Sequence, residues 1–192
     1  MKMKQKLILV LMVVALAQAA CGTFEVAVQE SVPTQVATLE AACPTPTAET
    51  KLLTNAEDGY CLLYPAEYST TIPKYIVINP ISSPGDIPGD AWLYIATAAA
   101  SGRTAAQIAD ENIAALDEGF NITRFAVEVD GEQAVVVDGL PSLDSARNVF
   151  IVHNDRLYNL IFMPWFPNAA EPTSLENLYT MAMDTLHFLP QE

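Results

Sequence analysis

Hydrophobic positions recur along this chain with the period of β-strands from near Asp58 onward. A first strand is predicted over 60–64, where Pro65 stops a run of aromatic and aliphatic residues. β-Branched residues predict a second strand over 75–78, and the stretch 91–98 predicts a third. The folded part therefore opens with three strands in succession.

The hydrophobic period changes to that of a helix after Thr104. Gln107 stands three residues beyond this threonine, which is the spacing of a capping box, and Gly119 is placed to end the helix. The apolar residues of this segment share one helical face. They are Ala105, Ile108, Ala109, Ile113 and Leu116.

Strand periodicity returns after this helix. Four strands are predicted over 122–129, 133–137, 148–152 and 156–163. Asp130-Gly131 is a typical hairpin dipeptide, and His153-Asn154-Asp155 supplies a second turn.

A last helix is predicted to begin near Thr173, with Glu176 as its capping-box partner. Its buried face would contain Leu175, Leu178, Tyr179, Ala182 and Leu186. Strands dominate, short hairpins join them, and the helices stand apart. The predicted fold class is therefore α+β, an antiparallel twisted sheet of about six to seven strands with two main helices.

The first twenty residues (1–20) predict a lipoprotein signal peptide. Three lysines precede the apolar stretch 7–17, whose helix of roughly 16 Å is too short for a hydrocarbon core of roughly 30 Å. Ala19-Ala20-Cys21 follows, so we expect Cys21 to carry a diacylglyceryl anchor that holds the protein on the extracytoplasmic side of the cell membrane. Gln18 replaces the apolar residue usual at its position, which leaves ordinary secretion after Ala17-Gln18-Ala19 as the alternative.

The segment behind this cysteine, 21–53, is rich in threonine, proline and alanine and keeps no regular period. That composition predicts a flexible tether, with the folded domain over 54–192. The three cysteines of the chain fit export, because lipidation of Cys21 leaves Cys43 and Cys61 able to form a disulfide. The other interpretation makes Cys61 a buried free thiol in a strand.

The charge of the chain limits its partners. It has 9 basic and 23 acidic residues; removal of the signal peptide takes three lysines and no acid, which leaves a formal charge of −17. Nucleic acid is therefore excluded as a partner. The acidic residues are scattered and lack the Asp-x-Asp-x-Asp-Gly spacing of a calcium loop, so no metal or cofactor is expected.

The sequence contains no recognisable catalytic motif: no Gly-x-Ser-x-Gly, phosphate-binding loop or His-Glu-x-x-His. One loop is unusually aromatic. Trp165 and Phe166 stand between prolines after the last predicted strand, and rigid aromatic residues of this kind are typical contacts for a protein partner. The alternative is that they fold back over a sheet edge or the last helix.

The order strands, helix, strand meander, helix resembles the PsbP/Mog-type fold, which includes the photosystem II extrinsic protein PsbP and many exported bacterial lipoproteins. The matching segments are Tyr60-x-Leu62-x-Tyr64-Pro65 with Tyr68, Gly102-x-Thr104, Val127-x-Val129-Asp130-Gly131 with Ala134, Arg147 with 149–152, Arg156-Leu157-Tyr158-x-Leu160-x-Phe162 and Leu186-His187-Phe188. All are core or turn positions.

Members of this group are mostly noncatalytic binding or assembly factors, so the resemblance implies a binding or assembly module with no enzymatic activity. Together with the anchor expected on Cys21, this predicts a lipid-anchored module. Two alternatives remain at this stage. One is an exported hydrolase with a carboxylate site that the sequence does not identify, and the other is a structural envelope lipoprotein.

Overall fold

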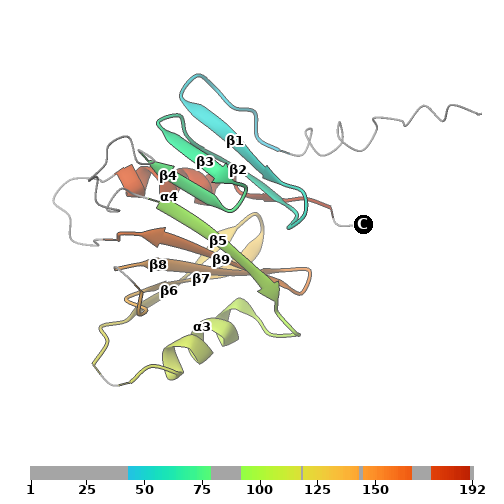
Figure 1. Ribbon diagram of the computed structural model, residues 1–192. Helices are drawn as coiled ribbons and strands as arrows, with labels where there is room; N and C mark the ends of the chain where they lie inside the picture. Colours follow the sequence, from blue (N-terminus) through green and yellow to red (C-terminus); the bar gives the residue numbers. More distant parts are fainter. Residues whose placement is uncertain (1–42, 79–91, 118, 143–144, 166–173, 191–192) are drawn as a thin grey trace, which may run out of the picture. The chain divides into compact units, whose positions relative to one another are not determined.

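The computed structural model describes residues 43–78, 92–117, 119–142, 145–165 and 174–190. Every strand pairing in these ranges is antiparallel, and the predicted α+β class is confirmed. The elements, labelled in Figure 1, are β1 (Thr50–Asn55), β2 (Tyr60–Pro65), β3 (Tyr68–Ile72), β4 (Tyr75–Ile78), β5 (Trp92–Ala99), α3 (Ala105–Ala114), β6 (Thr123–Val129), β7 (Glu132–Asp138), β8 (Arg147–His153), β9 (Arg156–Met163), α4 (Ser174–Thr185) and β10 (His187–Phe188).

The described strands form two sheets. Seven of them lie in the order β3-β4-β5-β9-β8-β7-β6, and three form a smaller sheet in the order β1-β2-β10. All seven strands that the sequence predicts are present. The sequence does not predict the smaller sheet. Its strand β10 has only two residues, and the six residues of β1 do not alternate regularly between apolar and polar.

The folded domain begins earlier than the sequence predicts. β1 occupies Thr50–Asn55, within the segment expected to be tether, and pairs along its whole length with β2. A disulfide between Cys43 and Cys61 joins the chain ahead of β1 to the start of β2. The strand β1 therefore lies across the predicted boundary at Leu53, which is wrong by several residues.

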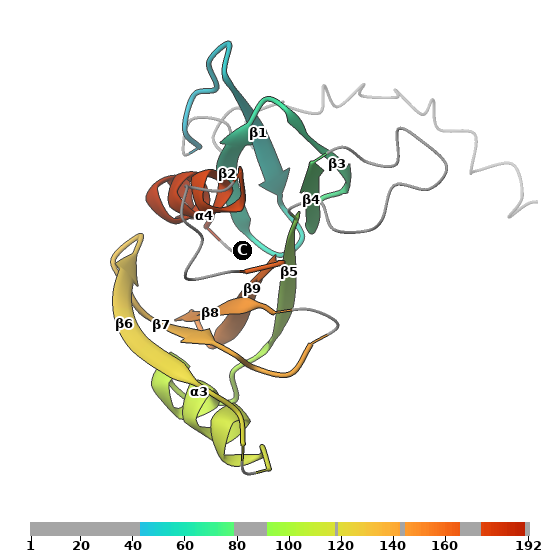
Figure 2. The same ribbon diagram turned by 90° about the vertical axis from the view of Figure 1, so that its left-hand side faces the viewer.

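Two hydrophobic layers enclose the large sheet, as Figure 2 shows with α3 on one side and α4 with β1 and β2 on the other. On the α4 side, Leu178 packs with the buried residues Leu62 and Leu160 of β2 and β9. On the α3 side, Ile108 packs with Val137 and Phe150 of β7 and β8. Successive side chains of each strand in the large sheet thus point alternately into one hydrophobic layer and the other.

The helix α3 has the predicted capping box but stops before Gly119. The Thr104 hydroxyl accepts a hydrogen bond from the Gln107 backbone N–H at 3.2 Å, and the Gln107 side chain accepts one from the Thr104 N–H at 2.9 Å. The helix packs on β7 and β8. The same face of β5 and β9, farther along the sheet order, is therefore not covered by α3.

The signal peptide, Cys21 and most of the predicted tether lie outside the described residues, and so do Phe166 and Thr173. Of the helices that the structure describes, neither has the length and apolar character needed to cross a membrane.

Candidate functional site

An open recess of about 440 Å³ lies on the part of the sheet that α3 does not cover. We call it the α3 pocket. The end of α3 forms one wall, and the segment 140–142 that follows β7 forms another. The floor is made by side chains from β5, β8 and β9, namely Trp92, Tyr94, Asn148, Phe150, Asn159 and Ile161.

The antiparallel register sets these floor residues in two rows across the three strands. Ile161 of β9 lies between Tyr94 of β5 and Asn148 of β8. In the next row Asn159 lies between Ala96 and Phe150. Each row therefore combines an aromatic side chain with an amide.

The two amides of the floor are hydrogen-bonded to each other. Asn159 Nδ2 donates to Asn148 Oδ1 at 3.3 Å, and Asn148 is only 6% exposed. Asn159 Oδ1 is buried and has no hydrogen-bond partner among the described residues. A buried acceptor left without a donor costs about 1–3 kcal/mol, so this amide lowers the stability of the folded chain locally.

The lining of the α3 pocket is uncharged. Its described residues include no carboxylate, ammonium, guanidinium, imidazole or thiol group. Nowhere in the described ranges do three or more histidine, cysteine, aspartate or glutamate side chains gather as metal ligands would. The arrangement is chemically suited to holding a molecule by stacking and hydrogen bonds.

A second recess, of about 470 Å³, contains charged groups that are already engaged with one another. Its centre is the carboxylate of Asp58, which lies 2.6 Å from Lys74 Nζ and 3.4 Å from Arg156 Nη1. The same carboxylate accepts hydrogen bonds from Thr97 Oγ1 at 2.8 Å and Asn55 Nδ2 at 2.7 Å. Four donors thus occupy both oxygens of Asp58.

These contacts fix the protonation state of Asp58. Burial by itself raises the pKa of this carboxyl, but hydrogen bonds from Lys74, Thr97 and Asn55 outweigh that effect, and the pKa lies below its ordinary value. In return, the hydrogen bond to Asp58 raises the pKa of the Lys74 ammonium. A carboxylate that is held ionised, with both oxygens hydrogen-bonded, is a poor general base. The role of this cluster is structural: it joins the turn after β1 to β5 and β9.

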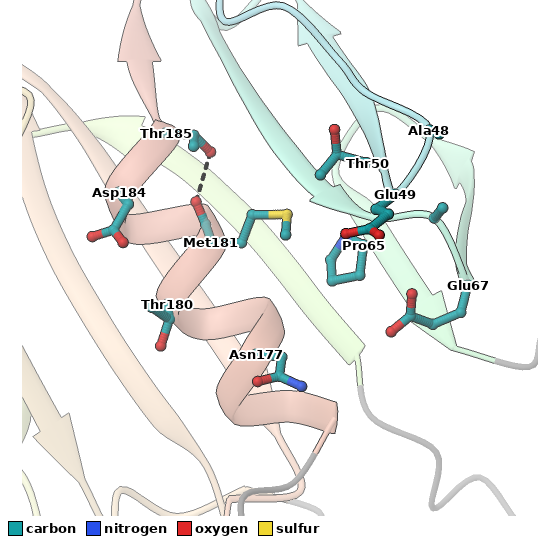
Figure 3. A pocket seen from close by; sticks show the side chains of 11 residues that line it. Ala48, Glu49, Thr50, Pro65, Glu67, Asn177, Thr180, Met181, Asp184 and Thr185 are labelled. Atoms are coloured by element: carbon teal, nitrogen blue, oxygen red, sulfur yellow. Dashed lines mark hydrogen bonds between the residues drawn. The ribbon is translucent and has the colours of Figure 1, made fainter.

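The third recess is a groove of about 810 Å³ between α4 and the ends of β1 and β2. Figure 3 shows Met181 extending from α4 toward Pro65, while Glu49 and Glu67 project from the strand side and Asp184 lies on the helix. The three acids come from separate segments and do not converge on one point (Figure 3). We call this recess the α4 groove.

The structure buries Trp165, so the expectation that this ring contacts a protein partner is wrong for the conformation described. Trp165 is 5% exposed, and its ring packs edge-on against Tyr179 of α4 with the centroids 5.3 Å apart. The position of Trp165 agrees with the alternative interpretation, in which the aromatic loop folds back over the last helix. The contact predicted for Phe166 falls outside the described residues.

Of the other residues singled out by the sequence, Cys43 and Cys61 do not line the α3 pocket, and Cys21 lies outside the described residues. Cys43 and Cys61 form the disulfide described above. Of the two interpretations of Cys61, a disulfide or a buried free thiol, the structure shows the disulfide. Sequence reasoning missed Asn148 and Asn159, although a signal exists. Each amide interrupts a strand at a position whose neighbours two residues away are apolar, which is unusual for a buried face.

Neither a protein-family model nor a curated protein matches this chain. Among solved structures, the chain is similar to the solution structure of cyanobacterial PsbP (CyanoP) from Synechocystis sp., with 12% sequence identity and a TM-score of 0.43. The match covers 75% of this chain and 95% of CyanoP. CyanoP belongs to the same fold group that the sequence resembles. A structural similarity this low gives no information about the ligand or partner of this chain.

Proposed function

We propose that this chain is a lipid-anchored binding module on the extracytoplasmic side of the cell membrane, and that it has no catalytic activity. The observation that carries the binding function is the α3 pocket, whose floor combines aromatic rings with a buried amide acceptor that lacks a donor. Pockets that bind small molecules have this composition, mostly apolar with a few polar groups.

Two further observations support export and anchoring. Cys21 ends a segment with the order of a lipoprotein signal, lysines first, then apolar residues, then small residues. The disulfide between Cys43 and Cys61 is typical of an oxidising compartment outside the cytoplasm. Twenty-one residues separate the proposed lipid on Cys21 from Cys43, where the disulfide attaches the chain to β2.

The hydrolase alternative receives less support from the described residues. The carboxylate with the most contacts, Asp58, has a lowered pKa, whereas a general acid at neutral pH needs a raised one. The acids of the α4 groove do not converge. We therefore place binding ahead of hydrolysis.

The anchor is tested by comparing the wild-type chain with Cys21→Ala in membrane and soluble fractions. We expect the wild type in the membrane fraction and the variant in the soluble one, because Ala17-Gln18-Ala19 still permits cleavage by a general signal peptidase. Mass spectrometry of the N-terminal peptide should find a diacylglyceryl group on Cys21. The matched control, Cys43→Ala/Cys61→Ala, should stay with membranes.

Either of two results would contradict the proposal. Membrane association of Cys21→Ala after verified signal cleavage would remove the anchor. Turnover of ester, peptide or glycoside substrates by the purified soluble variant, at a rate proportional to its concentration, would replace binding by hydrolysis.

A further inference from the structure

We infer that the outer strand β6 of the large sheet pairs with β6 of a second copy of this chain, antiparallel and centred on Ala126. Such pairing goes beyond the proposed binding function and requires neither the anchor nor the α3 pocket. Three features of β6 point to it: a regular open edge, exposed apolar side chains, and two opposite charges placed symmetrically about Ala126.

The two outer strands of the large sheet, β3 and β6, differ in how open they are. β6 ends the strand order and pairs only with β7 among the described strands (Figure 2). Its seven residues pair without a register shift and include no proline. In β3 the register shifts between Thr70 and Ile72, and Lys51 Nζ donates to the Tyr68 carbonyl at 2.7 Å. Bulges and prolines protect an edge against further pairing, and β6 has neither.

The turn at Asp130-Gly131 determines which backbone groups of β6 face outward. Both turn residues have positive φ, 49° and 80°, which is the type I′ geometry. Val129 and Glu132 flank this turn and form the hydrogen-bonded pair that closes the hairpin. Inward-bonded and outward-facing residues alternate along an antiparallel strand, so every second residue before Val129 directs its N–H and C=O away from β7. These residues are Arg124, Ala126 and Glu128.

Antiparallel pairing of two β6 strands about Ala126 brings opposite charges together. Arg124 of one copy then lies opposite Glu128 of the other, and the two-fold axis repeats this pair. A register shift of two residues leaves Glu128 opposite an uncharged residue, and a shift of four sets like charges opposite each other. Only the register centred on Ala126 therefore matches both charges of the strand.

The two charged side chains are accessible to a second copy. Both Arg124 and Glu128 are exposed, and alternation along β6 places them on the α3 side of the sheet. Arg124 contacts Asp110 of α3 through Nε at 2.8 Å, which leaves the other N–H groups of its guanidinium for a second carboxylate. Glu128 forms no ion pair with another described residue.

The residues between these charges pair apolar side chains on the opposite face of the sheet. Phe125 of one copy lies opposite Val127 of the other, again twice. Val127 packs against the core, whereas Phe125 is 37% exposed, so association would remove much of that ring from water. Pairs of aromatic and β-branched residues across strands are stabilising. Phe120 and Phe125 are two of the three large hydrophobic side chains exposed within the described ranges, so exposed apolar surface concentrates near this edge.

The acidic surface of the chain makes this association weak rather than absent. At an ionic strength of about 0.15 M, exposed charges farther apart than roughly 8 Å are largely screened, whereas partly buried pairs are screened much less. Main-chain hydrogen bonds supply the affinity when a strand is added to a sheet edge, and the side-chain pairs supply the register. A reversible dimer is therefore expected.

The test is sedimentation equilibrium of the soluble Cys21→Ala chain at physiological salt, from micromolar to millimolar concentration. We expect a reversible equilibrium between monomer and dimer. Amide hydrogen exchange followed by NMR should slow with rising protein concentration at Arg124, Ala126 and Glu128. The amides of Phe125 and Val127 are directed at β7 and should change less. Detergent-solubilised wild-type chain gives the same comparison, so the result does not depend on the anchor.

Charge reversal tests the register. Arg124→Glu and Glu128→Arg each set like charges opposite each other in both pairs, so either variant alone should dimerise at least about tenfold more weakly. An equimolar mixture of the two restores opposite charges in both pairs and should associate more tightly than either variant alone. Arg103→Glu makes the same charge change outside β6, at an exposed pair with Glu111, and should leave the dimer unchanged.

The contrary results are equally specific. A wild-type edge that stays monomeric up to millimolar concentration overturns the pairing. Equal dimerisation of Arg124→Glu and Arg103→Glu overturns the role of β6, and a mixture no tighter than its two components overturns the register. Because both reversed positions are exposed, all of these variants should keep the fold, which circular dichroism checks.

Discussion

The guanidinium carbon of Arg147 lies 3.8 Å from the centroid of the Trp165 ring. The same guanidinium lies 4.8 Å from the centroid of Tyr179 and forms two hydrogen bonds of 2.8 and 2.7 Å with the carboxylate of Asp138. Both charged side chains are almost completely buried, at 13% and 12% exposure. Trp165 therefore acts as the cover of a buried ion pair between β7 and β8.

We predict that Arg147→Met destabilises the fold strongly. The substitution preserves much of the side-chain volume but leaves the carboxylate of Asp138 buried without its cation, which costs about 3 kcal/mol or more. Urea unfolding followed by circular dichroism measures the change in the free energy of unfolding.

The matched control is Arg124→Met. Arg124 pairs with Asp110 at 2.8 Å, but both side chains are well exposed, so its loss should cost less than about 1 kcal/mol. Equal losses in the two variants would mean that burial of the Arg147 pair contributes nothing beyond a surface contact.

The aromatic loop illustrates what the sequence predicted and what it could not. Strand patterns predicted the segment 148–152, directly after Arg147, and the segment 156–163 before Trp165, and the capping box at Thr104 is confirmed. The sequence could not show that Trp165 turns inward, because its neighbours in space, Arg147 and Tyr179, are distant along the chain. Such pairings depend on the sheet order, which local patterns do not determine.

The α3 pocket was beyond sequence reasoning for a related reason. It exists because α3 packs on β7 and β8 and leaves β5 and β9 open, whereas the sequence predicts a longer helix that ends only at Gly119. The asparagines on its floor were visible in the sequence. Only the register between β8 and β9 brings Asn148 and Asn159 into contact.

Removal of the disulfide should weaken the domain measurably. Its cysteines are 18 residues apart, and closing a loop of that length stabilises a fold by about 3 kcal/mol in the chain-entropy model. We expect the variant Cys43→Ser/Cys61→Ala to lose about that amount in urea unfolding. Alanine is chosen at position 61 because Cys61 is fully buried.

Reductant provides the control for this loss. Wild-type protein unfolded and refolded in dithiothreitol should match the variant, and the variant itself should not respond. A wild-type unfolding curve that is identical with and without reductant, with thiol titration proving reduction, would show that the bridge does not stabilise the domain.

Gly139, at the start of the segment that walls the α3 pocket, should not tolerate alanine. Its φ is +91°, and an added Cβ would collide with the backbone carbonyl oxygen of Asn121. A fixed backbone atom cannot move aside as a flexible side chain can. We therefore expect Gly139→Ala to lower the free energy of unfolding by at least about 2 kcal/mol more than backbone strain alone.

The comparison for Gly139 is Gly131→Ala in the turn between β6 and β7. Gly131 also has a positive φ, +80°, but a Cβ there would meet no atom within 4 Å. Strain alone should cost about 1 kcal/mol at that position. Thermal unfolding of both variants reports the difference, and a smaller loss at Gly139 than at Gly131 would refute the collision.

Asp58 should make stability depend on pH in acid. Its pKa in the folded chain is below the ordinary value of 3.8, so the folded state favours the ionised carboxylate. The resulting stabilisation is fully present above pH 3.8 and disappears as the pH falls through the folded-state pKa. Protonation would break the contacts with Lys74 and Arg156 that tie the turn after β1 to its neighbours.

The measurement is the difference in free energy of unfolding between wild type and Asp58→Asn, followed from neutral pH into acid. Wild type should be more stable at neutral pH, and the difference should shrink once the pH falls below 3.8, because the wild-type carboxyl then takes up a proton and resembles the amide. Asp110→Asn, on the exposed face of α3, serves as the control, because loss of its solvent-exposed ion pair with Arg124 should cost less than about 1 kcal/mol. If the difference for Asp58→Asn grew toward acid instead, the folded-state pKa of Asp58 would have to be raised, and the cluster would hold a neutral acid rather than an ion pair.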